Sequence, residues 1–306
     1  MPPDSGCSNG LVRSAVGGAY EVELHQGHTV EAVLRGRLKQ QQRTGDAVVV
    51  GDRVVVQRHE DGGYTIEAVL DRTHELARRA PGKGRYRAKV MVANVDQIVV
   101  VFAVTHPAPR FRMLDRFLVL AESNHLDPVI IANKIDRGSA AERAAFAVYE
   151  EVGYPVIETS ARTGEGVARL RDRLCGRISV LAGPSGAGKS SLLNAIQPGL
   201  RLRTGAVSDA VRKGRHTTVS ARLIPLECGG YVADTPGLRE LGLWGVARED
   251  LDRCFPEMRP HMDACRFGRS CSHTHEPECA VRRAVEAGSI RAARFDSYSA
   301  LYAGEP

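Results

Sequence analysis

The sequence predicts an α/β domain with a mostly parallel sheet, preceded by a small all-β barrel and followed by a helical segment with a metal site. Apolar and polar residues alternate in short runs up to about residue 75, and continuous apolar runs alternate with helical spacings from residue 95. Three cysteines and a histidine then lie within fifteen residues. The expected parts are a barrel at 1–77, a basic linker at 78–94, the α/β domain at 95–246 and a zinc-binding helical domain at 247–306.

The bulk composition is that of a globular protein with two or three domains, each with its own core. Of the 306 residues, 43% are hydrophobic and 25% are charged. The first ten residues have no apolar signal-like core, and no run has the apolar length of a membrane span. We therefore expect a cytoplasmic protein with no membrane partner.

The positive charge is concentrated between residues 72 and 89. Seven Lys and Arg residues stand there against Glu75 alone, an excess of six that equals the net charge of the chain. Such a run is either a solvated linker or a strip that contacts a nucleic-acid backbone, and the run alone does not decide between them.

The first part reads as short strands separated by GD and DGG turn signals. Five or so strands in this length are typical of a small barrel, plausibly an OB-fold, whose usual ligands are oligonucleotides. A generic small β-domain is the alternative. Strands are expected at 20–24, 29–34, 46–50, 53–57 and 64–70.

The second part reads as a βαβ series, which predicts a parallel sheet covered by helices. Its strands are continuous apolar runs, as in a sheet that is buried on both faces. Strands are expected at 97–104, 129–133, 156–160, 178–182, 223–226 and 231–234, and helices at 111–124, 167–175 and 190–196. After about residue 245 no strand pattern remains, and 281–302 reads as helix.

The string GPSGAGKSS at 183–191 fits a phosphate-binding loop, and it lies between an apolar strand and an apolar helix as that motif requires. Its glycines let backbone N–H groups wrap a phosphate, and the helix N-terminus favours an anion. Lys189 is expected to reach the β- and γ-phosphates, and Ser190 to ligate Mg²⁺. The predicted loop contacts are Gly183, Pro184, Ser185, Gly186, Ala187, Gly188, Lys189, Ser190 and Ser191.

Two further strings predict that the base is guanine. In NKID at 133–136, Asp136 would accept the guanine N1–H and N2–H bonds, a donor pair that adenine lacks. Asn133 would support the loop and the purine edge, and the stem of Lys134 would lie over the ring. In ETSA at 158–161, the backbone would meet guanine O6. The predicted base-binding residues are Asn133, Lys134, Ile135, Asp136, Ser160 and Ala161.

The string DTPG at 234–237 and the Thr-rich GRHTTV at 214–219 predict the two nucleotide-sensing segments. Asp234 is expected to hold Mg²⁺ through water, and the Gly237 N–H to sense the γ-phosphate. Either Thr217 or Thr218 would supply a hydroxyl to Mg²⁺, and the sequence does not say which.

The residue after DTPG is Leu238, where many GTPases carry a glutamine that orients the attacking water. Leucine cannot do this, so we expect slow intrinsic hydrolysis. His216 is the best candidate within the chain for positioning water, and a solvated loop histidine is an equally good interpretation. We therefore expect a bound partner to order this loop and complete the site.

The order of these motifs is unusual, because the base-reading strings precede the phosphate loop. In an ordinary GTPase the phosphate loop opens the domain and NKxD closes it. The chain is therefore expected to be circularly permuted, with DTPG leading towards the C-terminal segment.

The cysteine usage favours a metal site in a reducing compartment over a disulfide framework. The seven cysteines are unevenly spread, and the cluster reads Cys265-x5-Cys271-x-His273-x5-Cys279. Three thiolates and an imidazole suit one tetrahedral structural zinc, which would stabilise a segment with little core of its own. Buried free cysteines or a redox pair are the alternatives.

Together these residues resemble the circularly permuted, ribosome small-subunit-dependent GTPase family RsgA/YjeQ, over nearly the whole chain. The strings that carry the resemblance are NKID, GPSGAGKSSLLN, GRHTT, DTPGLRELGLW, CFPE at 254–257 and CxHxxEPxCAV at 271–281. The resemblance implies hydrolysis of GTP to GDP, coupled to late maturation of the small ribosomal subunit and stimulated by it. It also implies that the barrel and the zinc domain touch ribosomal RNA, and so large a partner favours a monomer.

Three departures from the family pattern are present. Five residues, in place of the usual four, separate Cys265 from Cys271, Glu278 replaces a glycine, and Val219 replaces a third switch threonine. Two other functions stay open: a nucleotide-gated RNA-binding module in which hydrolysis is incidental, which Leu238 favours, and a P-loop ATPase or kinase, against which Asp136 argues.

Overall fold

The computed structural model describes residues 7–38, 48–79, 88–202, 221–234 and 246–305. The chain forms two compact units, each assembled from separate stretches of sequence. The first unit comprises residues 1–97, 172–181 and 208–239, and the second comprises 98–171, 182–207 and 240–306.

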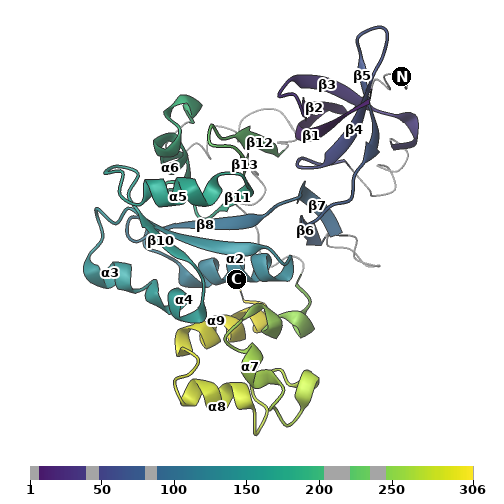
Figure 1. Cartoon of the computed structure of the whole chain (residues 1–306). Coiled ribbons are helices and arrows are strands. Elements are labelled where there is room, and N and C mark those ends of the chain that lie inside the picture. Colours follow the sequence, from purple (N-terminus) through teal and green to yellow (C-terminus); the bar gives the residue numbers. More distant parts are fainter. Residues whose placement is uncertain (1–6, 39–47, 80–87, 203–220, 235–245, 306) are drawn as a thin grey trace, which may run out of the picture. The chain divides into compact units, whose positions relative to one another are not determined.

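The first unit contains a closed five-stranded barrel, the OB-like domain expected from the sequence (Figure 1). The strand order is β1-β2-β3-β5-β4, and β4 pairs again with β1. All pairings are antiparallel except the parallel pair β3–β5. Val12, Val22, Val54 and Ile66 fill the core. The strands are β1 (Cys7–Val16), β2 (Ala19–Leu24), β3 (Thr29–Leu34), β4 (Arg53–Arg58) and β5 (Tyr64–Val69).

Two details of the barrel differ from the sequence prediction. Strand β1 was not predicted, because its sequence CSNGLVRSAV has weak strand formers and only Val12 is buried. The strand expected at 46–50 is wrong for its described part, residues 48–50. There the fully buried Asp52 accepts a hydrogen bond from Val49 N at 2.8 Å, which forms a local turn in place of a ladder.

Part of the expected basic linker is a second, two-stranded sheet of the first unit. It pairs β6 (Glu75–Arg79) with β7 (Ala88–Ala93) in antiparallel register. Arg72, just before it, donates to both Asp52 oxygens at 2.7 and 2.9 Å and to Glu75 at 3.0 Å. This arginine of the basic run therefore has a structural partner.

The rest of the first unit is a parallel pair with an antiparallel neighbour. Strand β11 (Ile178–Ala182) runs parallel to β13 (Tyr231–Asp234), and β12 (Arg222–Pro225) runs antiparallel to β13. β12 also pairs with β1 at Arg222 and Ser14. A disulfide joins Cys175 to Cys228. The cysteine pattern favours metal binding and does not predict this bond.

The second unit carries strands in the order β10-β9-β8, with β9 and β10 parallel. Every residue of β8 is buried, as its apolar run predicted. Strands β8 (Gln97–Ala103), β9 (Asp127–Asn133) and β10 (Val156–Thr159) are accompanied by helices α2 (Phe111–Ser123), α3 (Ala140–Ala144), α4 (Ala147–Val152), α5 (Val167–Leu174) and α6 (Lys189–Ile196), with a 3-10 turn at Pro198–Leu200.

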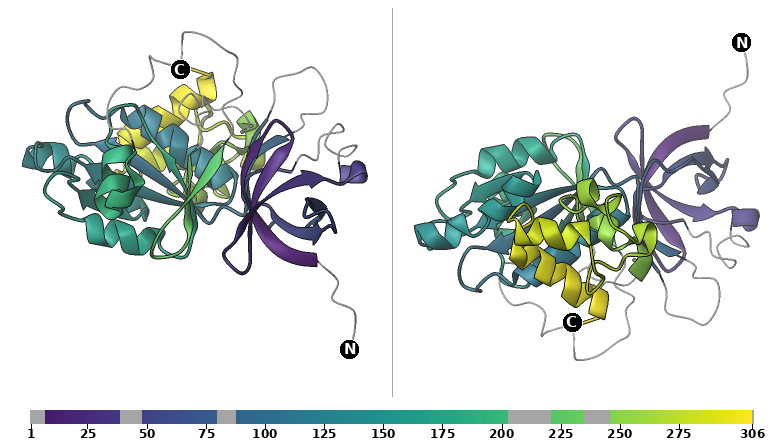
Figure 2. Two further views of the ribbon diagram at one scale, coloured as in Figure 1. Left: turned by 90° about the horizontal axis from the view of Figure 1, so that it is seen from above. Right: turned by 90° about the horizontal axis from the view of Figure 1, so that it is seen from below.

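The C-terminal part of the second unit is helical in its described residues 246–305, and in both views of Figure 2 its helices, in yellow, lie beside α2. The helix expected at 281–302 is broken at Gly288, whose φ is +77°. Val119 of α2 belongs to the same hydrophobic cluster as Phe255 and Tyr298. The helices are α7 (Arg259–Met262), α8 (Ala280–Glu286) and α9 (Ala292–Ala303), with 3-10 turns at Arg248–Asp250, Asp252–Cys254 and Gly268–Ser270.

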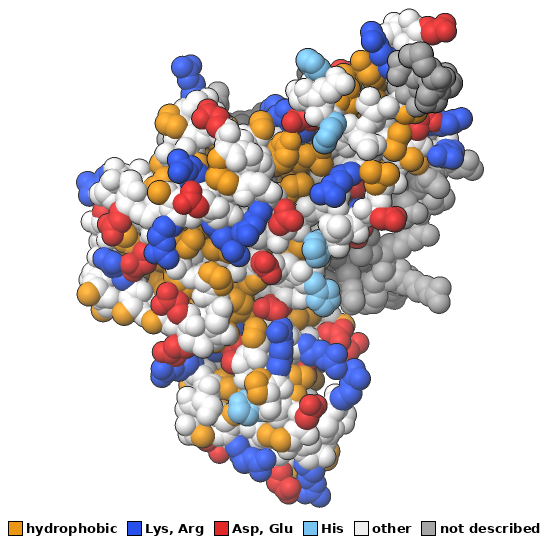
Figure 3. Space-filling view, in the orientation of Figure 1, with side chains coloured by type: hydrophobic (Ala, Val, Ile, Leu, Met, Phe, Trp, Pro, Cys, Tyr) orange, Lys and Arg blue, Asp and Glu red, His pale blue; other side chains and the backbone are white. Residues whose placement is uncertain are grey.

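Among the described residues, no helix combines the length and apolar character needed to cross a membrane. On the face shown in Figure 3, Lys and Arg side chains stand among Asp and Glu side chains. That face therefore does not present a field of a single sign.

Candidate nucleotide site and metal cluster

The loop at 183–191 has a backbone that only glycine adopts easily. Gly183, Gly186 and Gly188 have φ values of +128°, +78° and +99°. A Cβ on Gly183 would lie 2.1 Å from the carbonyl oxygen of Val101 in β8. Gly183 is therefore required by the close approach of β8 as well as by its own backbone conformation.

Lys189 lies at the start of α6, where its Nζ donates to the carbonyl oxygens of Gly183 and Pro184 at 2.7 and 2.8 Å. These bonds hold the ammonium against the loop. Ser190 and Ser191 follow in the first turn of the helix and are half-buried. A cation and the N–H groups of the helix start therefore face one small region, which suits a phosphate.

Asn133 connects the base-reading string to the phosphate loop. It ends β9 and is 1% exposed. Its Nδ2 donates to the carbonyl oxygen of Ala187 at 2.8 Å, and its Oδ1 accepts from Thr159 Oγ1 at 3.1 Å. A Cβ on Gly188 would lie 2.3 Å from Nδ2. One buried side chain thus ties β9, β10 and the loop together, although the loop follows Asn133 by about fifty residues.

Asp136 lies beside the ETSA string. Its Oδ1 accepts from Ser160 Oγ at 2.6 Å and its Oδ2 from Arg162 Nε at 2.7 Å. The hydrogen bond from Ser160 lowers the pKa of Asp136, burial opposes this, and Arg162 lowers it further. The carboxylate is therefore ionised at neutral pH and acts purely as an acceptor, as guanine N1–H and N2–H require.

The segment that follows β10 turns sharply, so that residues 163–166 lie close to Ser160 and Glu158. Thr163 N donates to Ser160 Oγ at 3.1 Å, and Gly166 has φ +70° with the Glu158 carbonyl 1.9 Å from where its Cβ would lie. The ETSA string includes Thr159, Ser160 and Ala161, whereas Arg162 and Gly166 lie beyond it and were not predicted. The glycines of TGEG were the available signal for the turn.

Lys134 has φ +64°, and its Nζ donates to the carbonyl oxygen of His106. Burial lowers the pKa of its ammonium. Ile135, the third residue of NKID, is buried and donates its N–H to Thr159 O at 3.2 Å. The NKID backbone is therefore held in place both by the hydrogen bond of Lys134 and by the buried Ile135.

The residues predicted to bind Mg²⁺ and to sense the γ-phosphate, apart from Ser190, belong to the first unit or lie outside the described residues. Asp234 is the exposed last residue of β13, in the first unit. His216, Thr217, Thr218, Gly237 and Leu238 lie outside the described residues.

The four predicted metal ligands come together in the second unit. Cys265, Cys271, His273 and Cys279 are buried, and their ligand atoms lie within 4.8 Å of one another. Cys265 Sγ is 3.8 Å from Cys279 Sγ, and His273 Nδ1 is 3.5 and 3.4 Å from these two sulfurs. With Zn–S of about 2.3 Å and Zn–N of about 2.0 Å, a tetrahedron has S–S edges of about 3.8 Å and S–N edges of about 3.5 Å. The separations among Cys265, His273 and Cys279 match both kinds of edge.

The surroundings of the cluster also suit a cation. Asp252 Oδ2 lies 3.4 Å from His273 Nε2, the nitrogen that faces away from the sulfurs. A carboxylate in this position fixes the ring so that Nδ1 is the ligand. Burial raises the pKa of Cys265, but hydrogen bonds from the Val281 and Ala280 N–H groups, together with Cys279 and the charge of His273, leave that pKa lowered. Asp252 was missed by the sequence analysis, since no motif marks it.

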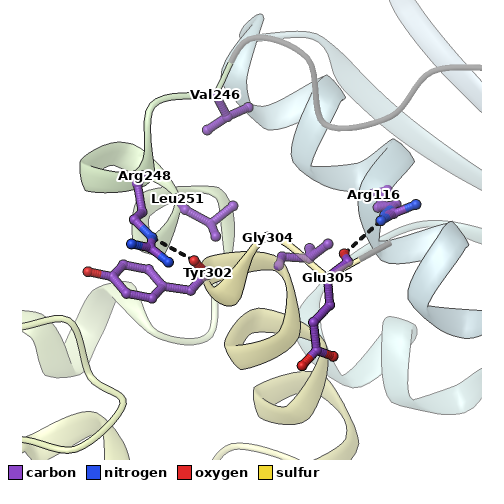
Figure 4. A pocket seen from close by; sticks show the side chains of 8 residues that line it. Arg116, Val246, Arg248, Leu251, Tyr302, Gly304 and Glu305 are labelled. Atoms are coloured by element: carbon purple, nitrogen blue, oxygen red, sulfur yellow. Dashed lines mark hydrogen bonds between the residues drawn. The ribbon is translucent and has the colours of Figure 1, made fainter.

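A separate pocket of about 390 Å³ opens beside the C-terminal end of α9 (Figure 4). Its two arginines are used locally. Arg248 Nε donates to Tyr302 O at 2.6 Å, and Arg116 donates to Glu305 O at 2.8 Å. They therefore satisfy backbone carbonyls at the end of this helix.

Comparisons with known proteins agree over nearly the whole chain. A family model described as RsgA GTPase matches residues 69–244, and one described as RsgA N-terminal domain matches residues 9–66. A Gemmatimonas aurantiaca protein named small ribosomal subunit biogenesis GTPase RsgA is 53% identical over 96% of each chain. A Moorella thermoacetica protein of the same name is 43% identical over 94% of each.

Solved structures match as well. The crystal structure of YjeQ from Thermotoga maritima has a TM-score of 0.81 at 37% identity and covers 97% of this chain and 98% of that one. The structure of YloQ, described as a circularly permuted GTPase, has a TM-score of 0.77 at 30% identity, with 99% and 96% covered. The resemblance drawn from the motifs is therefore confirmed, and the chain belongs to the RsgA family of circularly permuted GTPases.

Proposed function

We propose that this protein hydrolyses GTP to GDP and phosphate, and that hydrolysis is coupled to late maturation of the small ribosomal subunit. The observation that carries the proposal is the hydrogen bond from Asn133 Nδ2 to Ala187 O, which joins a base-reading string to a phosphate loop. The names of the relatives supply the ribosomal partner.

Each nucleotide residue has a distinct role in the proposal. Asp136 accepts two N–H bonds from guanine, because its ionised carboxylate offers only acceptors. Lys189 exchanges two neutral carbonyl acceptors for phosphate oxygens, an exchange that charge favours. Ser190, Asp234 and one of the threonines Thr217 or Thr218 would hold Mg²⁺, which neutralises charge on the β- and γ-phosphate oxygens when bound.

Hydrolysis requires a positioned water, and Leu238 cannot orient one. In our proposal the small subunit orders the segment around His216, whose imidazole positions the water. A His216→Ala variant that keeps wild-type turnover in the presence of small subunits would contradict this role. Turnover that falls only with subunits present would support it.

We further propose that Cys265, Cys271, His273 and Cys279 hold one zinc ion, with Asp252 orienting the histidine. Four protein ligands leave no open position, so the ion is structural. The barrel and this zinc module would be the surfaces that meet ribosomal RNA, in a monomeric protein.

GTP turnover by the purified protein tests the proposal, measured with small subunits, with large subunits and alone. Stimulation by the small subunit only is the expected result. Binding that depends on GTP without any stimulation would instead identify a nucleotide-gated RNA-binding module. If small subunits neither stimulate GTP turnover nor bind the protein in a GTP-dependent way, the ribosomal assignment is refuted.

A further inference from the structure

The disulfide between Cys175 and Cys228 is placed by strand register. Cys175 follows α5 three residues before Ile178, and Cys228 stands three residues before Tyr231, in the turn between β12 and β13. Ile178 and Tyr231 are partners in the parallel ladder of β11 and β13. If this register is extended three residues towards the N-terminus of each strand, Cys175 lies opposite Cys228. Their Cα atoms are 5.4 Å apart, which suits a disulfide.

Backbone contacts hold the two cysteine segments together independently of the sulfur atoms. Gly176 N donates to Gly229 O at 3.0 Å, and Tyr231 N donates to Arg177 O at 2.8 Å. A Cβ on Gly230 would lie 2.5 Å from Arg177 N, so the segments pack closely. These contacts bracket the cysteines, so the two thiols of a reduced protein face each other as well.

Exposure separates this pair from the other cysteines. Cys228 is exposed and Cys175 is half-buried. The four cysteines in the C-terminal part are buried. Cys7 is exposed but bonds to Gln57 Oε1 and has no second cysteine beside it. Among these residues, Cys175 and Cys228 alone combine solvent access with a cysteine neighbour outside the metal cluster.

We propose that Cys175 and Cys228 are a reversible redox modification site that a hydroperoxide closes. One peroxide oxygen is transferred to the exposed Cys228 thiol, which becomes a sulfenic acid, and the rest of the peroxide leaves as water, or as an alcohol when the peroxide is organic. The Cys175 thiol attacks that sulfur, the S–S bond forms, and a water departs. Two thiols thus lose two electrons to one peroxide, and a dithiol reductant reverses the step.

The disulfide closes a covalent loop of the chain, and this loop contains several of the predicted nucleotide-binding motifs. The 53-residue separation contains the phosphate loop, α6 and the Thr-rich string. It also fixes the start of β13, the strand that ends in Asp234. In the disulfide form, the turn between β12 and β13 stays tethered to Cys175 even when the hairpin leaves β11. The tether lowers the conformational entropy of the open state, so local opening of the hairpin is suppressed.

The test uses the full-length protein with Cys7→Ser, treated with hydrogen peroxide or with dithiothreitol. Peptide mapping should find Cys175 linked to Cys228 after peroxide and free after dithiothreitol. Hydrogen exchange of the amides at 222–234 should slow by at least about tenfold on oxidation. Cys228→Ser in the same background is the matched control, and its exchange should not respond to peroxide.

Two results would overturn the proposal. One is a map in which Cys175 and Cys228 stay free after peroxide or link to other cysteines. The other is a formed 175–228 link with unchanged exchange in the hairpin, which would remove the tethering role. Neither result depends on GTP turnover, so the proposed GTPase function is tested separately.

Discussion

Replacement of Arg294 by methionine should be among the most destabilising changes in the second unit. Arg294 in α9 is 2% exposed and donates to Glu257 at 2.6 Å and to Asp115 of α2. Its guanidinium also lies 4.7 Å from the centre of the Phe255 ring. Burial lowers the pKa of Arg294, but Asp115 and Glu257 outweigh it and raise that pKa, so the group stays charged.

Arg294→Met removes the cation and leaves two buried carboxylates without their partner. Breaking a buried pair in this way costs about 3–5 kcal/mol. The matched control is Arg291→Met, one turn away at the start of α9. Arg291 pairs with Glu151 at the surface, with exposed fractions of 60% and 48%, so its removal should change stability little.

Urea unfolding followed by circular dichroism measures both variants. The expected result is a clearly lower midpoint for Arg294→Met at an unchanged slope, with Arg291→Met close to wild type. Equal midpoints for the two variants would refute the inference that the ion pairs of Arg294 hold α9 against α2.

Three further predictions concern the same sites. Burial raises the pKa of Asp115 and Arg294 opposes this, so Arg294→Met should raise the pKa of Asp115 further. A carboxyl whose pKa is higher in the folded than in the unfolded protein loses stabilising free energy as pH rises above its unfolded pKa of about 4. The difference in urea midpoint between Arg294→Met and wild type should therefore grow above about pH 4. Asp252→Asn should weaken zinc affinity about 10–100-fold by chelator competition, with the exposed Asp263→Asn unchanged. Gly188→Ala should abolish nucleotide binding because its Cβ would meet Asn133. Gly153 has a similar φ of +103° but no atom near the position of a Cβ, so Gly153→Ala should bind nucleotide normally. Equal nucleotide binding by the two variants would refute the close packing of Gly188 against Asn133.

Much of this structure was predictable because the motifs need particular backbones. The phosphate loop, NKID and ETSA lie in the expected strand-end contexts, and the Cys/His spacing brought four ligands together. Strand β1 was not predicted because it forms through backbone pairing with β2 and β4, and only one of its side chains is fully buried. Local sequence does not report such pairing.

Long-range partners were the other features that the sequence could not supply. Cys175 and Cys228 meet through the register of β11 and β13, across 53 residues. Arg294 and Asp115 are further apart still, and buried charges carry no periodic signal. Such pairs are set by tertiary packing and become visible only when the elements are in place.

Nucleotide binding by Asp136→Asn tests the central claim, that the permuted motifs form one guanine-reading site. Wild type should prefer GDP over xanthosine diphosphate. The variant should lose about a hundredfold or more in GDP affinity, since two bonds to a charged acceptor are lost, and should gain affinity for the xanthine nucleotide. Arg162→Ala, which keeps the carboxylate, should still prefer GDP. An Asp136→Asn protein that binds GDP as tightly as wild type would contradict the account.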